Sequence, residues 1–97
     1  MMDLIITGRA RAEITAAIAY RYDRSPSSAR QLFDDFTRRF DELRQFPMMG
    51  RSRNDIRPEL RALLIENYIA FHFVRAEQII GIRVLDGRMN VEQEFSE

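Results

Sequence analysis

The spacing of hydrophobic residues changes along the chain and divides it into segments of different expected structure. The β-branched run at residues 3–7 predicts a first strand that ends at Gly8. Residues 9–23 are rich in alanine, and their larger apolar positions recur with the period of a helix. The stripe that should face the core consists of Ala10, Ile14, Ala17 and Ile18.

A second helix is predicted directly after the first. Ser25 is a favourable N-cap and Pro26 suits the first helical position, where its missing N–H is not needed. Pro47 should end this helix. Because only a short turn separates the two helices, we expect an antiparallel hairpin. Its second helix should bury Phe33, Phe36, Phe40 and Leu43 and pair Asp34 with Arg38 and Asp35 with Arg39 on the solvent side.

Three further strands are predicted at residues 60–65, 69–75 and 79–85, after a loop that contains Gly50. The short gaps between them fit hairpins, so the strands should form an antiparallel meander. The order β-α-α-β-β-β predicts one α+β domain over residues 1–97, with an N-terminal strand and a helical hairpin packed on an antiparallel sheet. Met48 and Met49 should lie at the edge of the core, and the tail from residue 89 carries no structural prediction.

Strand alternation separates two faces of the predicted sheet. The bulkier set is expected to meet the helices; it comprises Ile69, Phe71, Phe73, Ile80, Ile82 and Val84. The opposite face then carries Ala70, His72, Val74, Ile79, Gly81, Arg83 and Leu85. That face is too apolar for one turned to water, so we expect it to be covered by a separate partner chain or, alternatively, by a second copy of this chain.

Composition limits the classes of function. The chain has 97 residues and zero formal net charge, and all 15 basic residues are arginine, which argues against broad phosphate binding. Without cysteine and with one histidine, neither a disulfide nor a zinc site is expected, and no cofactor is predicted. No apolar run reaches the ~20 residues that a membrane span needs, and the N-terminus does not resemble a secretory signal, so we expect a cytoplasmic protein.

A few residues could carry chemistry. His72 would need solvent access and a charged neighbour such as Arg83 to act as an acid or base, whereas a lone strand histidine is typically structural. Arg83 on the semi-apolar face requires an acidic or carbonyl partner, from another chain or from Asp86 or Glu92. After a turn at Gly87, where positive φ is expected, Arg88 either binds strand-end carbonyls or contacts a target.

Several segments resemble the ParE toxins of bacterial toxin–antitoxin modules, part of the wider RelE/ParE fold group. These segments are "FPMMGRSRNDIRPELRAL", "NYIAFHFV" and "IRVLDGRMN". The family typically reads "NPRxGR … D(I/L)RPGLR … GSHxIFYRV … (I/V)RVLHGRMD" in the same order. This chain departs from that pattern at Asp86, where histidine is common, and in the wording of "NYIAFHF".

The resemblance implies a toxin that inhibits DNA gyrase by direct binding and is neutralised by a ParD-like antitoxin. It also implies that no residue is catalytic. Candidate target-binding residues are Arg51, Arg57, Arg83, Arg88 and Met89. Candidate antitoxin-binding residues are Ala70, His72, Val74, Ile79, Arg83 and Leu85.

Two alternatives remain open at this point. The first is a ribosome-dependent mRNA endonuclease of the RelE type, which the zero net charge, the absence of lysine and a tail without tyrosine or histidine disfavour. The second is a homodimeric interaction domain without toxicity.

Overall fold

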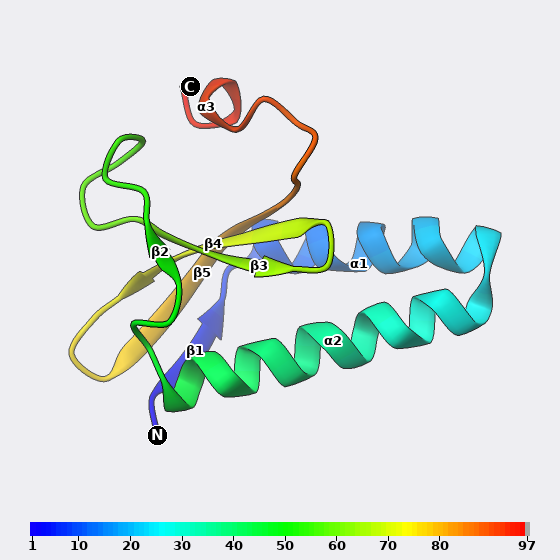
Figure 1. Ribbon diagram of the computed structural model, residues 1–97, viewed down its shortest axis with the longest axis horizontal. Helices are drawn as coiled ribbons and strands as arrows, with labels where there is room; N and C mark the ends of the chain where they lie inside the picture. Colours follow the sequence, from blue (N-terminus) through cyan, green and yellow to red (C-terminus); the bar gives the residue numbers. More distant parts are fainter. Residues whose placement is uncertain (97) are drawn as a thin grey trace.

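A helical hairpin covers one face of a five-stranded sheet, and the C-terminal segment lies against the other face (Figure 1). The computed structural model describes residues 1–96. In chain order its elements are β1 (Asp3–Ile6), α1 (Gly8–Arg24), α2 (Pro26–Gln45), β2 (Arg51–Ser52), β3 (Arg61–Ile65), β4 (Tyr68–Val74), β5 (Gln78–Asp86) and α3 (Val91–Glu94). The predicted α+β order is confirmed; β2 and α3, too short to leave a periodic signal, are additions to it.

Ser25 joins the two long helices as predicted. Its backbone N–H donates to the Arg21 carbonyl at 2.9 Å and so closes the last turn of α1. Its side-chain oxygen accepts the N–H of Ser28 at 3.2 Å and so caps α2, which begins at Pro26. One residue therefore ends one helix and begins the next, which keeps the hairpin turn short.

The sheet has the strand order β1-β5-β4-β3-β2. Strands β3, β4 and β5 form the predicted antiparallel meander, while β1 pairs in parallel with β5, so the complete sheet is mixed. The residues between β3 and β4 form a two-residue turn that starts at Glu66, whose φ is +52°. From α1, Arg21 donates to the Glu66 carboxylate at 2.9 Å and to the Asn67 side chain at 3.0 Å, which ties this turn to the hairpin.

The predicted assignment of the two sheet faces was wrong for most residues. On β4 the small Ala70 faces the helices and packs in the core with Leu32 and Phe36, whereas Phe71 lies in the second core on the opposite face. The small side chain lets the alanine-rich hairpin approach the sheet closely. The bulky residues of β4 are buried instead by the C-terminal segment and by the loop before β3.

A β-bulge explains why simple alternation fails on β5. Gly81 lies opposite His72 and Arg83 lies opposite Phe71, so Ile82 is an extra residue in the ladder. Alternation therefore reverses across Ile82. Ile79 and Val84, which an unbroken strand would place on opposite faces, both face the helices. Ile82 and Leu85 lie on the outer face.

Three further predictions about side-chain packing were wrong. Phe33 is 56% exposed and lies outside the core, whereas Phe36, Phe40 and Leu43 pack in or against it as predicted. The arginines of α2 also pair with other carboxylates than predicted: Arg38 binds Asp35 and Glu42, and Arg39 binds Glu42. Met48 and Met49, expected at the core edge, are 63% and 38% exposed.

Within residues 1–96, no helix combines the length and apolar character needed to cross a membrane.

Candidate partner-binding surfaces

The predicted target-binding residues lie in three separate places. Arg51 is exposed on β2, the edge strand at the left of Figure 1. Arg57 and Arg83 line one cavity beside α3 on the outer face of the sheet. Arg88 and Met89 lie in the turn that follows β5, and both are exposed. The structure therefore joins only Arg57 and Arg83 into one site.

Arg83 finds its acidic partners within the chain. Its Nε and Nη2 atoms donate to the Glu13 carboxylate at 3.0 and 2.8 Å, and Nη2 also donates to Glu94 at 3.0 Å. These two residues, rather than Asp86 or Glu92, satisfy the buried guanidinium. The hydrogen bond to Glu13 is the main cause that raises the pKa of Arg83.

Glu13 is a residue that sequence reasoning missed. Its Oε1 atom accepts the Val84 N–H at 2.8 Å, at a part of β5 that extends beyond the end of β1. Thr7 supports the same edge by donating to the Ile82 carbonyl at 3.4 Å. Side chains of α1 and its N-cap thus replace a missing strand neighbour. In the sequence, the available sign of this role was that Glu13 is the single glutamate of an alanine-rich helix.

Phe95 anchors the C-terminal segment on the outer face. Its ring meets Phe71 edge-on, with 5.0 Å between the ring centroids. The Cζ atoms of Arg57 and Arg83 lie 5.2 and 5.8 Å from the centroid of the same ring. The C-terminal segment is therefore held by an edge-to-face aromatic contact, by two cations beside the Phe95 ring and by the Arg83–Glu94 ion pair.

Arg88 pairs with the residue at which this chain departs from the family pattern. The Asp86 carboxylate accepts two hydrogen bonds from Arg88, one from its backbone N–H at 2.9 Å and one from its Nη2 atom at 2.8 Å. These hydrogen bonds lower the pKa of Asp86 to about 2. Gly87 does not have the positive φ that was expected; an added Cβ would instead approach the Asn67 carbonyl oxygen at 3.1 Å.

The predicted antitoxin-binding residues do not form an exposed surface in this chain. Ala70 and Ile79 are buried beneath the helices, and Leu85 is buried in the outer core beside Phe71. Val74 is half-buried, and His72 is only 1% exposed. Arg83, the remaining residue of the set, lines the cavity beside α3.

His72 belongs to a buried polar cluster beneath the segment between α2 and β2. Its Nδ1–H group donates a hydrogen bond to the Ala70 carbonyl at 3.1 Å. Arg61, opposite His72 on β3, donates to the carbonyls of Met48 and Gly50. Burial, and secondarily the charge of Arg61, lowers the pKa of His72. The histidine is therefore neutral and enclosed, which is the structural alternative considered above.

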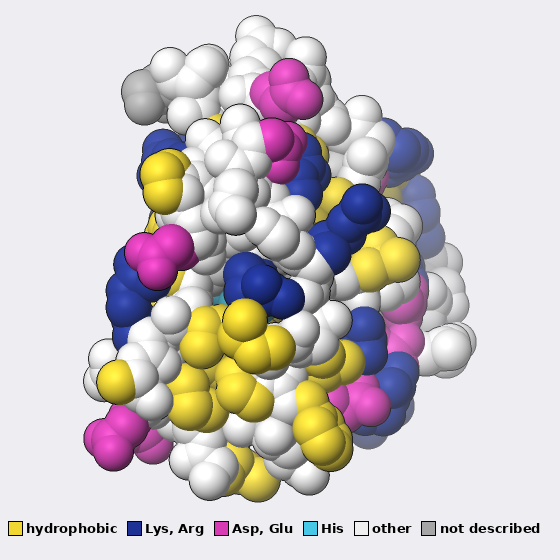
Figure 2. Space-filling view, turned by 60° about the vertical axis from the view of Figure 1, so that its left-hand side comes forward, with side chains coloured by type: hydrophobic (Ala, Val, Ile, Leu, Met, Phe, Trp, Pro, Cys, Tyr) yellow, Lys and Arg dark blue, Asp and Glu magenta, His cyan; other side chains and the backbone are white. Residues whose placement is uncertain are grey.

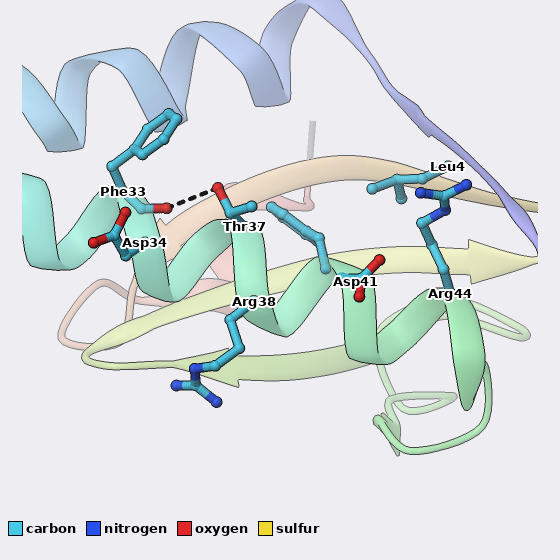
Figure 3. Close-up of a pocket in the computed structure, with 8 residues that line it drawn as sticks. Leu4, Phe33, Asp34, Thr37, Arg38, Asp41 and Arg44 are labelled. Carbon is cyan, nitrogen blue, oxygen red and sulfur yellow. Dashed lines mark hydrogen bonds between the residues drawn. The ribbon is translucent and has the colours of Figure 1, made fainter.

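An exposed apolar groove runs along the helical hairpin. One cavity of about 560 Å³ lies beside α2, and its lining includes Phe33 and Phe40. Figure 3 shows Phe33 projecting from α2, with Asp34, Arg38 and Asp41 on the same helix. A second cavity, of about 650 Å³, lies between α1 and α2 and is also lined by Phe33. We call these two adjoining cavities the hairpin groove; besides Phe33 they are lined by Leu4, Ile18, Tyr22, Pro26, Ala29 and Phe40.

A second exposed apolar group follows α2. Phe46 and Met48 are 65% and 63% exposed, and Met49 lies beside them in sequence. Figure 2 shows hydrophobic side chains gathered on the lower half of the face that includes this segment. Isolated apolar residues are common on protein surfaces, but a cluster of this kind is typical of a contact surface.

Comparisons with known proteins agree with the fold. The family model described as the ParE toxin of the type II toxin–antitoxin system, parDE, matches residues 4–91. Toxin ParE3 of Caulobacter vibrioides is 38% identical over 52 residues, which are 54% of this chain and 52% of that toxin. The match thus spans about half the length of this curated relative.

A solved structure described as the chromosomal ParDE TA system from P. aeruginosa has a chain of the same architecture. The TM-score is 0.72 at 25% sequence identity, and the alignment covers 87% of this chain and 94% of that chain. The structural similarity therefore agrees with the family match over residues 4–91. The chain belongs to the ParE toxin family of type II toxin–antitoxin systems.

Proposed function

We propose that this chain is the toxin of a type II toxin–antitoxin module, that it inhibits DNA gyrase by direct binding, and that a ParD-like antitoxin neutralises it. The observation that carries the proposal is the family match over residues 4–91. The similarity to a chain of a ParDE system supports an antitoxin as partner. Gyrase is the target that the family resemblance implies.

The geometry favours binding over catalysis. A general acid or base must reach its substrate, and His72 is buried with a pKa lowered mainly by burial. The Arg83 guanidinium, which could stabilise a phosphate, is already bound by Glu13 and Glu94. No observation in the described part of the chain favours the RelE-type nuclease over a binding toxin.

The hairpin groove is the surface we assign to the antitoxin. Phe33 and Tyr22 are 56% and 59% exposed in it, and carboxylates and arginines of α2 lie along its rim. An amphipathic segment of a partner would bury these rings and leave its polar side to the charged rim. This assignment replaces the sheet residues that sequence reasoning favoured, because the hairpin covers Ala70 and Ile79 and the outer core encloses Leu85.

The test combines cells and purified protein. Expression of the chain alone is expected to stop growth with signs of DNA damage, and co-expression of a cognate ParD-like antitoxin should restore growth. Purified chain should block supercoiling by gyrase, and pre-incubation with the antitoxin should remove the block. Ribosome-dependent mRNA cleavage with unaffected supercoiling would overturn the gyrase assignment in favour of the nuclease. A stable, non-toxic homodimer would favour the alternative of a homodimeric interaction domain without toxicity.

A further inference from the structure

The outer face of the sheet holds a cavity that the proposed function does not explain. It has a volume of about 280 Å³ and lies between the sheet, the start of α1 and the C-terminal segment. Phe73, Ile82 and Phe95 form its apolar walls. The side chains of Arg9, Arg57 and Arg83 also line it, so three cations from distant parts of the sequence meet at one small site.

The charge of Arg83 is balanced, but the charges of the other two arginines are not. Glu13 and Glu94 form ion pairs with Arg83 at 2.8 and 3.0 Å. Among residues 1–96, no ion pair within 4 Å involves Arg9 or Arg57. The polar side-chain contact of Arg57 is a 3.5 Å hydrogen bond to the Phe95 carbonyl. With Arg9, Arg57 and Arg83 counted against Glu13 and Glu94, one net positive charge remains beside an apolar wall.

Neither free arginine is needed for the stability of its own element. Arg9 lies in the first turn of α1, where the helix dipole disfavours a cation and where no acidic residue compensates it. Arg57 contacts the ring of Phe95, and a neutral side chain of similar length would pack on that ring as well. Two exposed guanidiniums beside a hydrophobic wall are instead suited to a ligand with a carboxylate and an apolar part.

We propose that this cavity binds an acidic peptide of a partner protein, with a carboxylate paired to Arg9 and Arg57 and a neighbouring apolar side chain on Phe73, Ile82 and Phe95. A nucleic-acid strand suits the site less well. The chain has zero formal net charge, and the carboxylate of Glu94 in the cavity wall would repel a run of phosphates. A peptide with a single carboxylate brings fewer negative charges near Glu94 than a run of phosphates does, and its apolar side chains can contact the apolar walls.

This inference deepens the proposed function, because it gives a protein partner of the toxin a docking chemistry separate from the hairpin groove. It rests on the proposed function only in taking the partner to be a protein. Peptide binding by the purified chain needs neither gyrase nor living cells. A chain that binds the peptide but does not inhibit gyrase would therefore contradict the proposed function and leave the site intact.

The test is an NMR titration of the ¹⁵N-labelled chain with the blocked peptide acetyl-Leu-Glu-Leu-amide. Saturable shifts are expected at the Arg57 side chain and at Phe95, and the peptide with glutamine in place of glutamate should bind more weakly. One charge-assisted hydrogen bond stabilises a complex enough to change affinity by about tenfold. Arg9→Gln and Arg57→Gln should each weaken binding by roughly that factor.

Arg11→Gln is the matched control, because Arg11 is exposed on α1 but does not line the cavity. Arg9→Gln is decisive if Arg57→Gln disturbs the Phe95 signals, since within residues 1–96 no side-chain hydrogen bond or ion pair joins Arg9 to the C-terminal segment. Equal binding of the two peptides, shifts confined to other surfaces, or no shift at millimolar peptide would overturn the proposal. Stronger binding of an oligothymidylate at the same signals would replace it with a nucleic-acid site.

Discussion

Glu59 has a φ of +68° in the loop before β3, a conformation that a residue with a side chain rarely adopts. The family pattern D(I/L)RPGLR carries glycine at this position, where this chain reads DIRPELR. The Glu59 N–H donates to the Asn54 side chain at 2.7 Å, which helps to hold the strained conformation. Glycine adopts this φ without a steric cost, so the strain comes from the Glu59 side chain and not from the backbone path of the fold.

We predict that Glu59→Gly stabilises the chain by about 1 kcal/mol, because glycine relieves the left-handed strain and keeps the N–H donor. A domain of this size should then melt roughly 4–8 °C higher. Chemical and thermal denaturation measure the change. Glu59→Ala is the control, since it removes the carboxylate but keeps the strain. An equal gain from both variants would show that charge, and not backbone conformation, is responsible.

The Asp86–Arg88 pair permits a prediction about pH. The folded-state pKa of Asp86 is about 2, below its ordinary value of 3.8, so the carboxylate stabilises the fold fully above about pH 4. That contribution should be lost as the pH falls from 3.8 towards 2. Arg88→Gln should raise the Asp86 pKa towards 3.8, as measured by ¹³C NMR of the carboxyl group. Arg51→Gln should leave it unchanged, and an unchanged value in Arg88→Gln would contradict the assignment of the shift.

At the scale of elements, the sequence predicted best those features that depend on interactions between residues close together in the chain. The end of α1 and the start of α2 depend on Ser25 and Pro26, whose capping chemistry acts within four residues. The faces of β4 and β5 depend on the bulge at Ile82 and on the packing of Phe95, and neither leaves a periodic signal. The partner of Arg83 lies 70 residues away at Glu13, so no local rule could identify it.

The same distinction applies to the candidate site. The family motifs led to Arg57 and Arg83, which the structure places in one cavity. They gave no indication of Arg9 or Phe95, which join that cavity only through the tertiary fold. Ala70, one of the sheet residues chosen from strand alternation, is buried. Alternation alone cannot say which face of the sheet the helices cover, so this burial could not be predicted.

The Glu13–Arg83–Glu94 network connects α1, β5 and α3, and it yields a prediction at this scale. Glu13→Gln keeps an acceptor for the Val84 N–H but leaves Arg83, whose side chain is 7% exposed, with one carboxylate instead of two. The loss should be about 2–3 kcal/mol, typical of a buried hydrogen bond to a charged group. Urea denaturation with an unchanged m-value would measure it. Asp23→Asn removes a carboxylate of the same helix that forms no ion pair within residues 1–96, and it should cost far less.

At the scale of the whole molecule, the two proposed binding surfaces lie on different layers. The hairpin groove is formed by α1, α2 and Leu4, whereas the acidic-peptide cavity lies under the C-terminal segment on the outer face of the sheet. One chain could therefore engage a partner on each layer. A substitution in one surface should spare the other, which makes the two assignments separable.

Phe33→Asp tests this separation. Phe33 lines both cavities of the hairpin groove and lies outside the core, so the variant should fold normally. Loss of a central aromatic contact typically costs about 2 kcal/mol, so antitoxin affinity should fall roughly thirtyfold. Isothermal titration with the antitoxin measures this change. The variant should still inhibit gyrase, and co-expressed antitoxin should protect cells less well.

Leu64→Asp is the matched control for that experiment. Leu64 is 61% exposed on β3, close to the exposure of Phe33, and it does not line the hairpin groove. It should therefore leave antitoxin affinity unchanged. If Leu64→Asp weakened antitoxin binding and Phe33→Asp did not, the antitoxin would bind the sheet and not the hairpin. If Phe33→Asp bound the antitoxin normally but lost gyrase inhibition, the hairpin groove would be a gyrase-binding surface and not the antitoxin-binding surface.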